Sequence, residues 1–130
     1  MPNNETNLIR DVAKMRAEFA YAQVKNFVDQ NNQEKQKEYK SYVKKLPALI
    51  QTNGLSATLA FMFSKGGTYG KIFDQMNLWL QECGLKRDEE LMEWVLQRDS
   101  AEYRRTTAEI MALLNWMRRF ADGMVKNDRG

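Results

Sequence analysis

The basic residues of this chain are the side chains whose types and positions point most directly to a chemical role. Adjacent arginines can hold phosphate oxygens through bidentate hydrogen bonds, and lysines attract phosphate without reading sequence. One basic pair precedes Pro47, two arginine pairs lie near the C-terminus, and one lysine ends an apolar run. We therefore predict a nucleic-acid-binding surface that contacts the phosphate backbone and comprises Lys44, Lys45, Lys65, Arg104, Arg105, Arg118 and Arg119.

A solvated helix surface is the alternative explanation for the same basic residues. In that case ion pairs within one helix would occupy them, for example Glu102 with Arg105 three residues later. The aromatic residues around Lys65 leave a similar choice, because they can stack on unpaired bases or fill a core; they are Phe61, Phe63 and Tyr69. For these aromatic residues and for the eight methionines, core packing is the favoured interpretation.

The residues that catalysis and metal binding require are scarce in this chain. Histidine, the commonest general base and metal ligand, is absent. The one cysteine, Cys83, falls on an apolar stripe and is expected in the core. Four acids cluster at the predicted start of a helix, where the helix dipole stabilises negative charge that faces water: Asp88, Glu89, Glu90 and Glu93. We expect no catalytic site, no metal and no cofactor.

The length and composition fit one helical domain. The chain has 130 residues, of which 43% are hydrophobic, and only two prolines and seven glycines interrupt it. A single cysteine excludes an intramolecular disulfide, which fits a reducing compartment. The N-terminal residues are polar, and no run approaches the roughly 18 apolar residues that span a bilayer. We expect a cytoplasmic protein with no membrane association.

Apolar periodicity and helix stop signals predict an all-α fold, a single compact bundle of about six helices. The whole chain, 1–130, is predicted to be one helical domain with short flexible termini at about 1–6 and 126–130. Thr6 or Asn7 is the expected cap of the first helix. The predicted helices cover about 7–29, 34–52, 55–64, 68–83, 88–97 and 100–125.

Several positions within these helices carry sharper expectations. Pro47 lacks a backbone donor and should kink or break the second helix. The helix at 55–64 is apolar almost all round, so we expect it to be central and covered by others. Gly84 is placed to stop the fourth helix, and Asp99 with Glu102 has the spacing of a capping box. Arg16 interrupts an apolar stripe and therefore needs a partner or a functional reason.

Two long segments resemble a known family. The run YKSYVKKLPALIQTNGLSATLAFMFSK (39–65) is similar to the signature of the CRISPR-associated Cmr small-subunit family, the fifth protein of the type III-B RAMP-module effector complex. Its features are a basic turn, a proline, an Asn-Gly-Leu break and an apolar helix ending in Ser-Lys. The run YRRTTAEIMALLNWMRRFADG (103–123) resembles the C-terminal helix of that family, and residues 16–22 resemble its first helix. The acidic stretch 82–102 does not contribute to this resemblance.

The resemblance implies an all-helical protein without a catalytic role. Family members assemble beside the backbone subunits that hold the guide RNA and help to form the groove occupied by the target RNA. The implied partners are the other Cmr subunits, guide RNA, single-stranded target RNA and further copies of the same chain stacked in the complex. Matched by position, the seven basic residues named above are the implied RNA contacts. Arg16 is a further candidate, for which a structural ion pair is favoured.

Our hypothesis from the sequence is a non-catalytic, RNA-facing subunit of an RNA-guided antiviral complex. The alternative is a helical adaptor that binds only protein through its acidic fifth helix and exposed methionines. A surface of both signs suits the first hypothesis, since the chain carries a net charge of +3 although residues 82–102 are locally acidic.

Overall fold

The structure is a computed structural model that describes the backbone of residues 4–126 and the side chains of residues 11–126. Six helices and no strand occur in this range, which confirms the predicted all-α class. The helices are α1 (Asn4–Gln30), α2 (Gln33–Asn53), α3 (Leu55–Lys65), α4 (Gly67–Glu82), α5 (Leu91–Leu96) and α6 (Ser100–Met124). No helix in the described part of the chain is long and apolar enough to cross a membrane.

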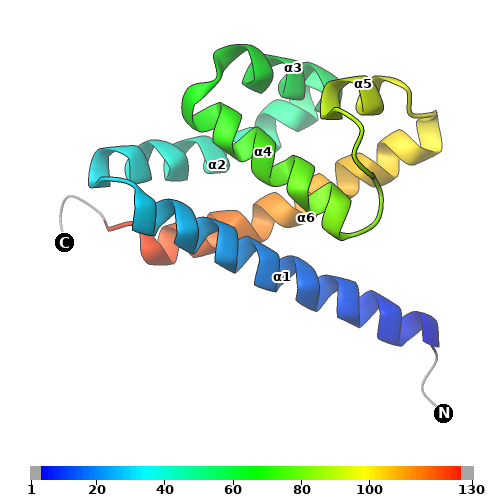
Figure 1. The fold of residues 1–130 in the computed structure, drawn as a ribbon, viewed down its shortest axis with the longest axis horizontal. Coiled ribbons are helices and arrows are strands. Elements are labelled where there is room, and N and C mark those ends of the chain that lie inside the picture. The colour runs from blue at the N-terminus through cyan, green and yellow to red at the C-terminus, as the bar shows by residue number, and fades with distance from the viewer. Residues whose placement is uncertain (1–3, 127–130) are drawn as a thin grey trace.

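The long helices α1, α2 and α6 form the base of the molecule, α3 and α5 lie above them, and α4 crosses diagonally in front (Figure 1). α1 and α6 run in the same direction, whereas α2 and α4 run the opposite way. α6 is the central element of the base because it packs against both α1 and α2. α3 and α5 lie at the top of the view, farthest from α1.

One hydrophobic cluster joins buried residues from all six helices. Its largest fully buried side chains are Trp79 and Tyr39, which come from α4 and α2. Tyr39 stacks on Phe27 of α1, with ring centroids 4.2 Å apart. Trp79 lies against Phe19 of α1, at 5.3 Å between centroids. The core is therefore aromatic where α1 meets α2 and α4, and aliphatic along α6.

The helix ends follow the local chemistry of the sequence. Asp99 caps α6 by accepting the backbone N–H of Glu102 at 2.8 Å, and the Glu102 side chain completes the predicted capping box. Asn32 caps α2 in the same way, accepting from the N–H of Lys35 at 2.9 Å. Gly84 follows α4 with φ +82°, a conformation that glycine adopts without the strain of a Cβ, as the predicted stop required. Gly66, with φ +64°, makes a one-residue corner between α3 and α4, shorter than the expected loop.

α2 runs unbroken through Pro47, so the predicted break is wrong. A proline removes one hydrogen bond of the helix, at a cost of about 3 kcal/mol. Around it, Val43, Leu46 and Ile50 are buried in the core and hold the turns on both sides of the proline together. Burial of this stripe offsets the lost hydrogen bond.

α3 is not the covered central helix that its composition predicts. Leu55, Leu59 and Met62 are buried, but Phe61 is 38% exposed and Phe63 is 62% exposed. The helix lies at the edge of the molecule and buries only one side (Figure 1). An apolar sequence that packs on one side leaves its other side as an exposed apolar surface.

Two predicted helix starts also differ from the structure. α5 begins at Leu91 and not at Asp88, because the Glu90 carboxylate caps it by accepting the N–H groups of Met92 and Glu93. α1 already begins at Asn4, so the expected caps Thr6 and Asn7 lie inside the helix; their side chains are outside the described residues.

Candidate nucleic-acid interface

The seven predicted basic residues are all exposed, but they do not form one patch. Lys44 and Lys45 lie on α2, Lys65 ends α3, and the two arginine pairs lie at opposite ends of α6. Neighbouring residues on a helix point about 100° apart, so each pair divides between two sides of its helix. The structure therefore distributes the predicted charge over several surfaces.

Six of these seven residues lack an ion pair, whereas most other cations in the described part of the chain have one. Lys44 is paired, with its Nζ 3.2 Å from the Asp122 carboxylate of α6. For the other six, no carboxylate among residues 11–126 lies within ion-pairing distance. The Glu102–Arg105 pair of the alternative explanation does not form; Glu102 instead meets Arg98 at 3.3 Å. Six exposed cations are thus available to an outside anion.

The lysine pair of α2 and the second arginine pair of α6 approach each other near Lys44. Its partner Asp122 lies one helical turn after Arg118, so the contact between the middle of α2 and the end of α6 brings Lys44 and Arg118 to the same edge of the molecule. The i+4 spacing puts Arg118 and Asp122 on one face of α6, with Arg119 turned further outward. This edge carries more positive than negative charge even after the ion pair is counted.

A second group of residues, which we call the α2–α3 face, combines aromatic rings with two lysines. It consists of Tyr42 and Lys45 of α2, Phe61 and Lys65 of α3, and Tyr69 from the first turn of α4. Tyr42 and Tyr69 stack with ring centroids 3.8 Å apart and planes within 2° of parallel. The edge of Phe61 meets Tyr69 at 5.1 Å, and Lys65 Nζ lies 5.9 Å from the centre of the Phe61 ring. Partial burial raises the pKa of the Tyr69 hydroxyl, and its electrostatic interaction with Tyr42 adds to the shift.

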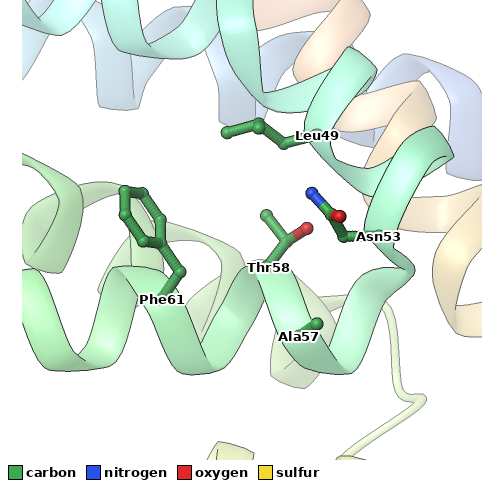
Figure 2. Close-up of a pocket in the computed structure, with 5 residues that line it drawn as sticks. All are labelled: Leu49, Asn53, Ala57, Thr58 and Phe61. Atoms are coloured by element: carbon green, nitrogen blue, oxygen red, sulfur yellow. The ribbon is translucent and has the colours of Figure 1, made fainter.

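A hollow of about 270 Å³ opens beside these rings, between the end of α2 and the exposed side of α3. Figure 2 shows Leu49 of α2 and Phe61 of α3 facing each other across it, with Thr58 between them. Asn53 places its carboxamide at one end, and Ala57 completes the lining. The Thr58 hydroxyl donates to the Gly54 carbonyl at 2.9 Å, whereas the Asn53 carboxamide has no hydrogen-bond partner among the described residues.

Arg16 has a structural partner, as the favoured interpretation of the sequence required. Its guanidinium donates two hydrogen bonds to the Glu109 carboxylate, Nε to Oε1 at 2.6 Å and Nη2 to Oε2 at 3.1 Å. The indole N–H of Trp79 donates to the same Oε1 at 2.9 Å. The two charged side chains are only 17% and 16% exposed. Arg16 therefore joins α1, α4 and α6 and is not available to an RNA phosphate.

The remaining candidates for chemistry are accounted for by packing. Cys83 is half-buried, and burial raises the pKa of its thiol, which lowers its thiolate fraction at neutral pH. No three His, Cys, Asp or Glu side chains of residues 11–126 come together as a metal site. Among the methionines described, Met15 alone is exposed, and the others fill or border the core.

Comparison with known proteins decides the family. The model of the CRISPR-associated protein family Cas_Cmr5 matches residues 12–124. The chain belongs to this family. A relative from Thermus thermophilus, described as CRISPR system Cmr subunit Cmr5, is 34% identical over 89 residues, covering 68% of this chain and 76% of the relative. The crystal structure of a CRISPR-associated Cmr5 family protein from the same organism matches with a TM-score of 0.75 and 28% identity, over 88% of this chain and 98% of that one.

The comparisons confirm the family resemblance read from 39–65 and 103–123. Sequence reasoning missed the hollow, with Leu49 and Asn53, and the stacked partner of Tyr69, which is Tyr42. One signal was available: Tyr42, Lys45 and Leu49 are spaced three and four residues apart, as on one face of a helix. These α2 residues were not recognised as part of a surface because α3 was expected to be covered. A covered α3 would leave no exposed face next to them.

Proposed function

We propose that this Cmr5 family member is a non-catalytic structural subunit of an RNA-guided Cmr complex and contacts the phosphate backbone of guide or target RNA. The observation that carries the proposal is the set of six exposed cations without a carboxylate partner in the described part of a Cmr5 family chain. Unpaired surface cations gain more from a phosphate than paired ones, because no existing ion pair must be broken first.

Its partners in this role are the other subunits of the complex, guide RNA and single-stranded target RNA. The curated relative is described as a Cmr subunit, which supports an assembled role for this chain. The basic residues lie at separated places on α2, α3 and α6. Such a distribution suits a subunit that follows an extended strand, with further copies stacked along it, better than one that encloses a small ligand. The complex would work in the cytoplasm, where its RNA target is present.

The experiment is reconstitution of the complex with a variant that removes three unpaired charges, Lys45→Gln, Arg118→Gln and Arg119→Gln. Exposed charge contacts contribute about 0.5 kcal/mol each, so loss of three weakens target RNA binding about tenfold. Affinity is measured by fluorescence anisotropy of a labelled target strand at fixed salt.

The matched control removes three ion-paired lysines, Lys14→Gln, Lys25→Gln and Lys35→Gln, whose partners are Glu18, Asp29 and Glu38. The control has the same net charge as the test variant, and we expect it to bind as the wild type does. Equal affinities for all three proteins would refute the proposed RNA contact and leave a subunit that acts through protein contacts alone.

A further inference from the structure

The hollow on the α2–α3 side combines three properties that restrict what can occupy it. It is walled by apolar groups of Leu49, Ala57 and Phe61, and it carries the solvent-exposed carboxamide of Asn53 at one end. Two lysines without a carboxylate partner among the described residues lie one helical turn from its walls. Lys45 precedes Leu49 by four residues on α2, and Lys65 follows Phe61 by four on α3. Residues four apart are neighbours on a helix surface, so each lysine flanks one wall of the hollow.

The volume of the hollow suits an occupant about the size of one planar ring system. Pockets that enclose drug-sized ligands measure roughly 300–1,000 Å³, and this one, at about 270 Å³, is just below that range. An amphipathic helix would need anchor sites over two turns of a groove, which a hollow lined by five residues does not provide. The occupant should be flat and apolar on its faces, polar at its edge, and attached to negative charge.

We propose that this hollow receives one unstacked base of single-stranded RNA, with Phe61 against the base, the Asn53 carboxamide at its edge, and Lys45 and Lys65 on the adjoining phosphates. Aromatic side chains stack on bases of any sequence, and asparagine is suited to the paired donor and acceptor of adenine. The inference rests on the proposed RNA contact and adds to it a base-binding site and a preference for adenine.

Charge complementarity favours RNA over a protein segment as the occupant. The two lysines beside the hollow attract an anion, and the Phe61 ring can stack on a flat π-system. A nucleotide carries both, as its phosphate and its base. The cation–π contact of Lys65 with Phe61 already holds that ammonium group over one face of the ring. A base on the other side of the ring would leave the lysine in place to reach the next phosphate.

The experiment is amide chemical-shift mapping of the full chain with an oligoadenylate of about 12 nucleotides, within the usual site sizes for single strands. The wild type should show its largest shifts at Asn53, Ala57 and Thr58. An abasic strand of equal length should leave these three amides unmoved and perturb only the basic residues. An oligouridylate should bind at the same amides about fivefold more weakly than oligoadenylate, because its base is smaller and lacks the adenine edge.

Two variants of α3 make the test independent of folding. Ala57→Leu fills the hollow from an exposed position, so the core is untouched, while Ala60→Leu adds the same side chain at an exposed position that does not line it. We expect Ala57→Leu to weaken oligoadenylate binding at least fivefold and Ala60→Leu to leave it unchanged. Shifts confined to the α6 arginines would overturn the base site and leave the proposed RNA contact standing.

Three further outcomes would contradict a base bound in the hollow. Equal effects of Ala57→Leu and Ala60→Leu, or equal shifts with the abasic strand, contradict a base in the hollow. If Ala57→Leu instead blocks assembly with the other Cmr subunits and leaves RNA binding intact, the hollow is a protein contact and the inference is wrong. If the charge-removal variant of the reconstituted complex also binds target RNA normally, the proposed function falls together with this site.

Discussion

Two regions of this molecule use the same kinds of side chain in opposite ways. Where α1, α4 and α6 meet, a cation and an aromatic ring, Arg16 and Trp79, are joined by one carboxylate, Glu109. On the α2–α3 face, Lys45 and Lys65 accompany aromatic rings and no carboxylate among the described residues pairs with either lysine. The position of a carboxylate, more than the cation itself, therefore separates a structural charge from one available to a partner.

The largest effect should come from removing that carboxylate. Glu109→Ala leaves Arg16 unpaired in a mostly buried position and leaves the Trp79 indole N–H without an acceptor. Because the Arg16 and Glu109 side chains retain slight solvent access, we expect a loss of about 2–3 kcal/mol in the free energy of unfolding, somewhat below the cost for a fully buried pair. Urea denaturation followed by circular dichroism measures it.

The control for this prediction is Glu18→Ala, which removes the exposed partner of Lys14. We expect a change below about 0.5 kcal/mol. If both substitutions lower the free energy of unfolding by the same amount, the ion pair of Arg16 is no more important for stability than an exposed one.

A neutral buried contact should follow next in size. The Tyr39 hydroxyl donates to the Gln75 side chain at 2.8 Å, and Gln75 in turn donates to the Gln23 carbonyl of α1 at 3.3 Å. Tyr39→Phe leaves the Gln75 oxygen without its donor, so we expect a loss of about 1–2 kcal/mol at neutral pH, measured by the same urea denaturation.

The pH dependence of this contact has a definite sign. Burial raises the pKa of the Tyr39 hydroxyl above its ordinary value of 10.0, with the Gln75 hydrogen bond opposing the shift. Above pH 10 the unfolded chain releases the proton while the folded chain keeps it, so wild-type stability falls as pH rises. The advantage of the wild type over Tyr39→Phe should therefore shrink above pH 10; a constant difference from pH 8 to about 11 would contradict this account.

A smaller effect is expected at the start of α3, whose N-cap, Gly54, has no side chain. The Tyr103 hydroxyl of α6 accepts the Ser56 N–H at 2.9 Å and takes the place of a cap. Tyr103→Phe should cost about 1 kcal/mol. It should also speed hydrogen exchange of the Ser56 amide, which mass spectrometry can follow. Unchanged exchange at Ser56 would show that the hydroxyl does not hold the helix start.

The smallest effect should appear where the cations are free. Lys45→Gln, Arg118→Gln and Arg119→Gln together should change the free energy of unfolding by less than about 0.5 kcal/mol, because no partner within the described chain is lost. Thermal unfolding of the purified chain checks this. A larger destabilisation would mean that these residues have structural partners after all, and the contrast with Arg16 would fail.

Much of the fold followed from local signals in the sequence. Apolar periodicity located the six helices, and the capping box at Asp99 and the glycine at position 84 placed two of the ends. The resemblance of 39–65 and 103–123 led to the family that the comparisons confirm. The break expected at Pro47 rests on the local cost of a proline alone. α2 stays continuous there because Val43 and Ile50 are buried, and only the tertiary structure supplies that burial.

The candidate site was less predictable than the fold. Lys45 and Lys65 were identified by charge, but their relation to Tyr42 and to the hollow depends on how α2 packs against α3. The composition of α3 predicted a covered helix, since apolar residues alone do not reveal which side remains open. The pairing of Lys44 with Asp122, 78 positions later in the chain, depends on the α2–α6 contact and has no sequence signal.

We propose that unpaired cations of this subunit bind RNA phosphates. The salt dependence of target RNA binding is the most direct test of this contact. Each phosphate contact with a single strand contributes about 0.7 to the slope of log affinity against log salt, so Lys45→Gln, Arg118→Gln and Arg119→Gln together should lower the slope of the reconstituted complex by about two. The Lys14→Gln, Lys25→Gln and Lys35→Gln control should keep the wild-type slope. Identical slopes for all three complexes would contradict the account.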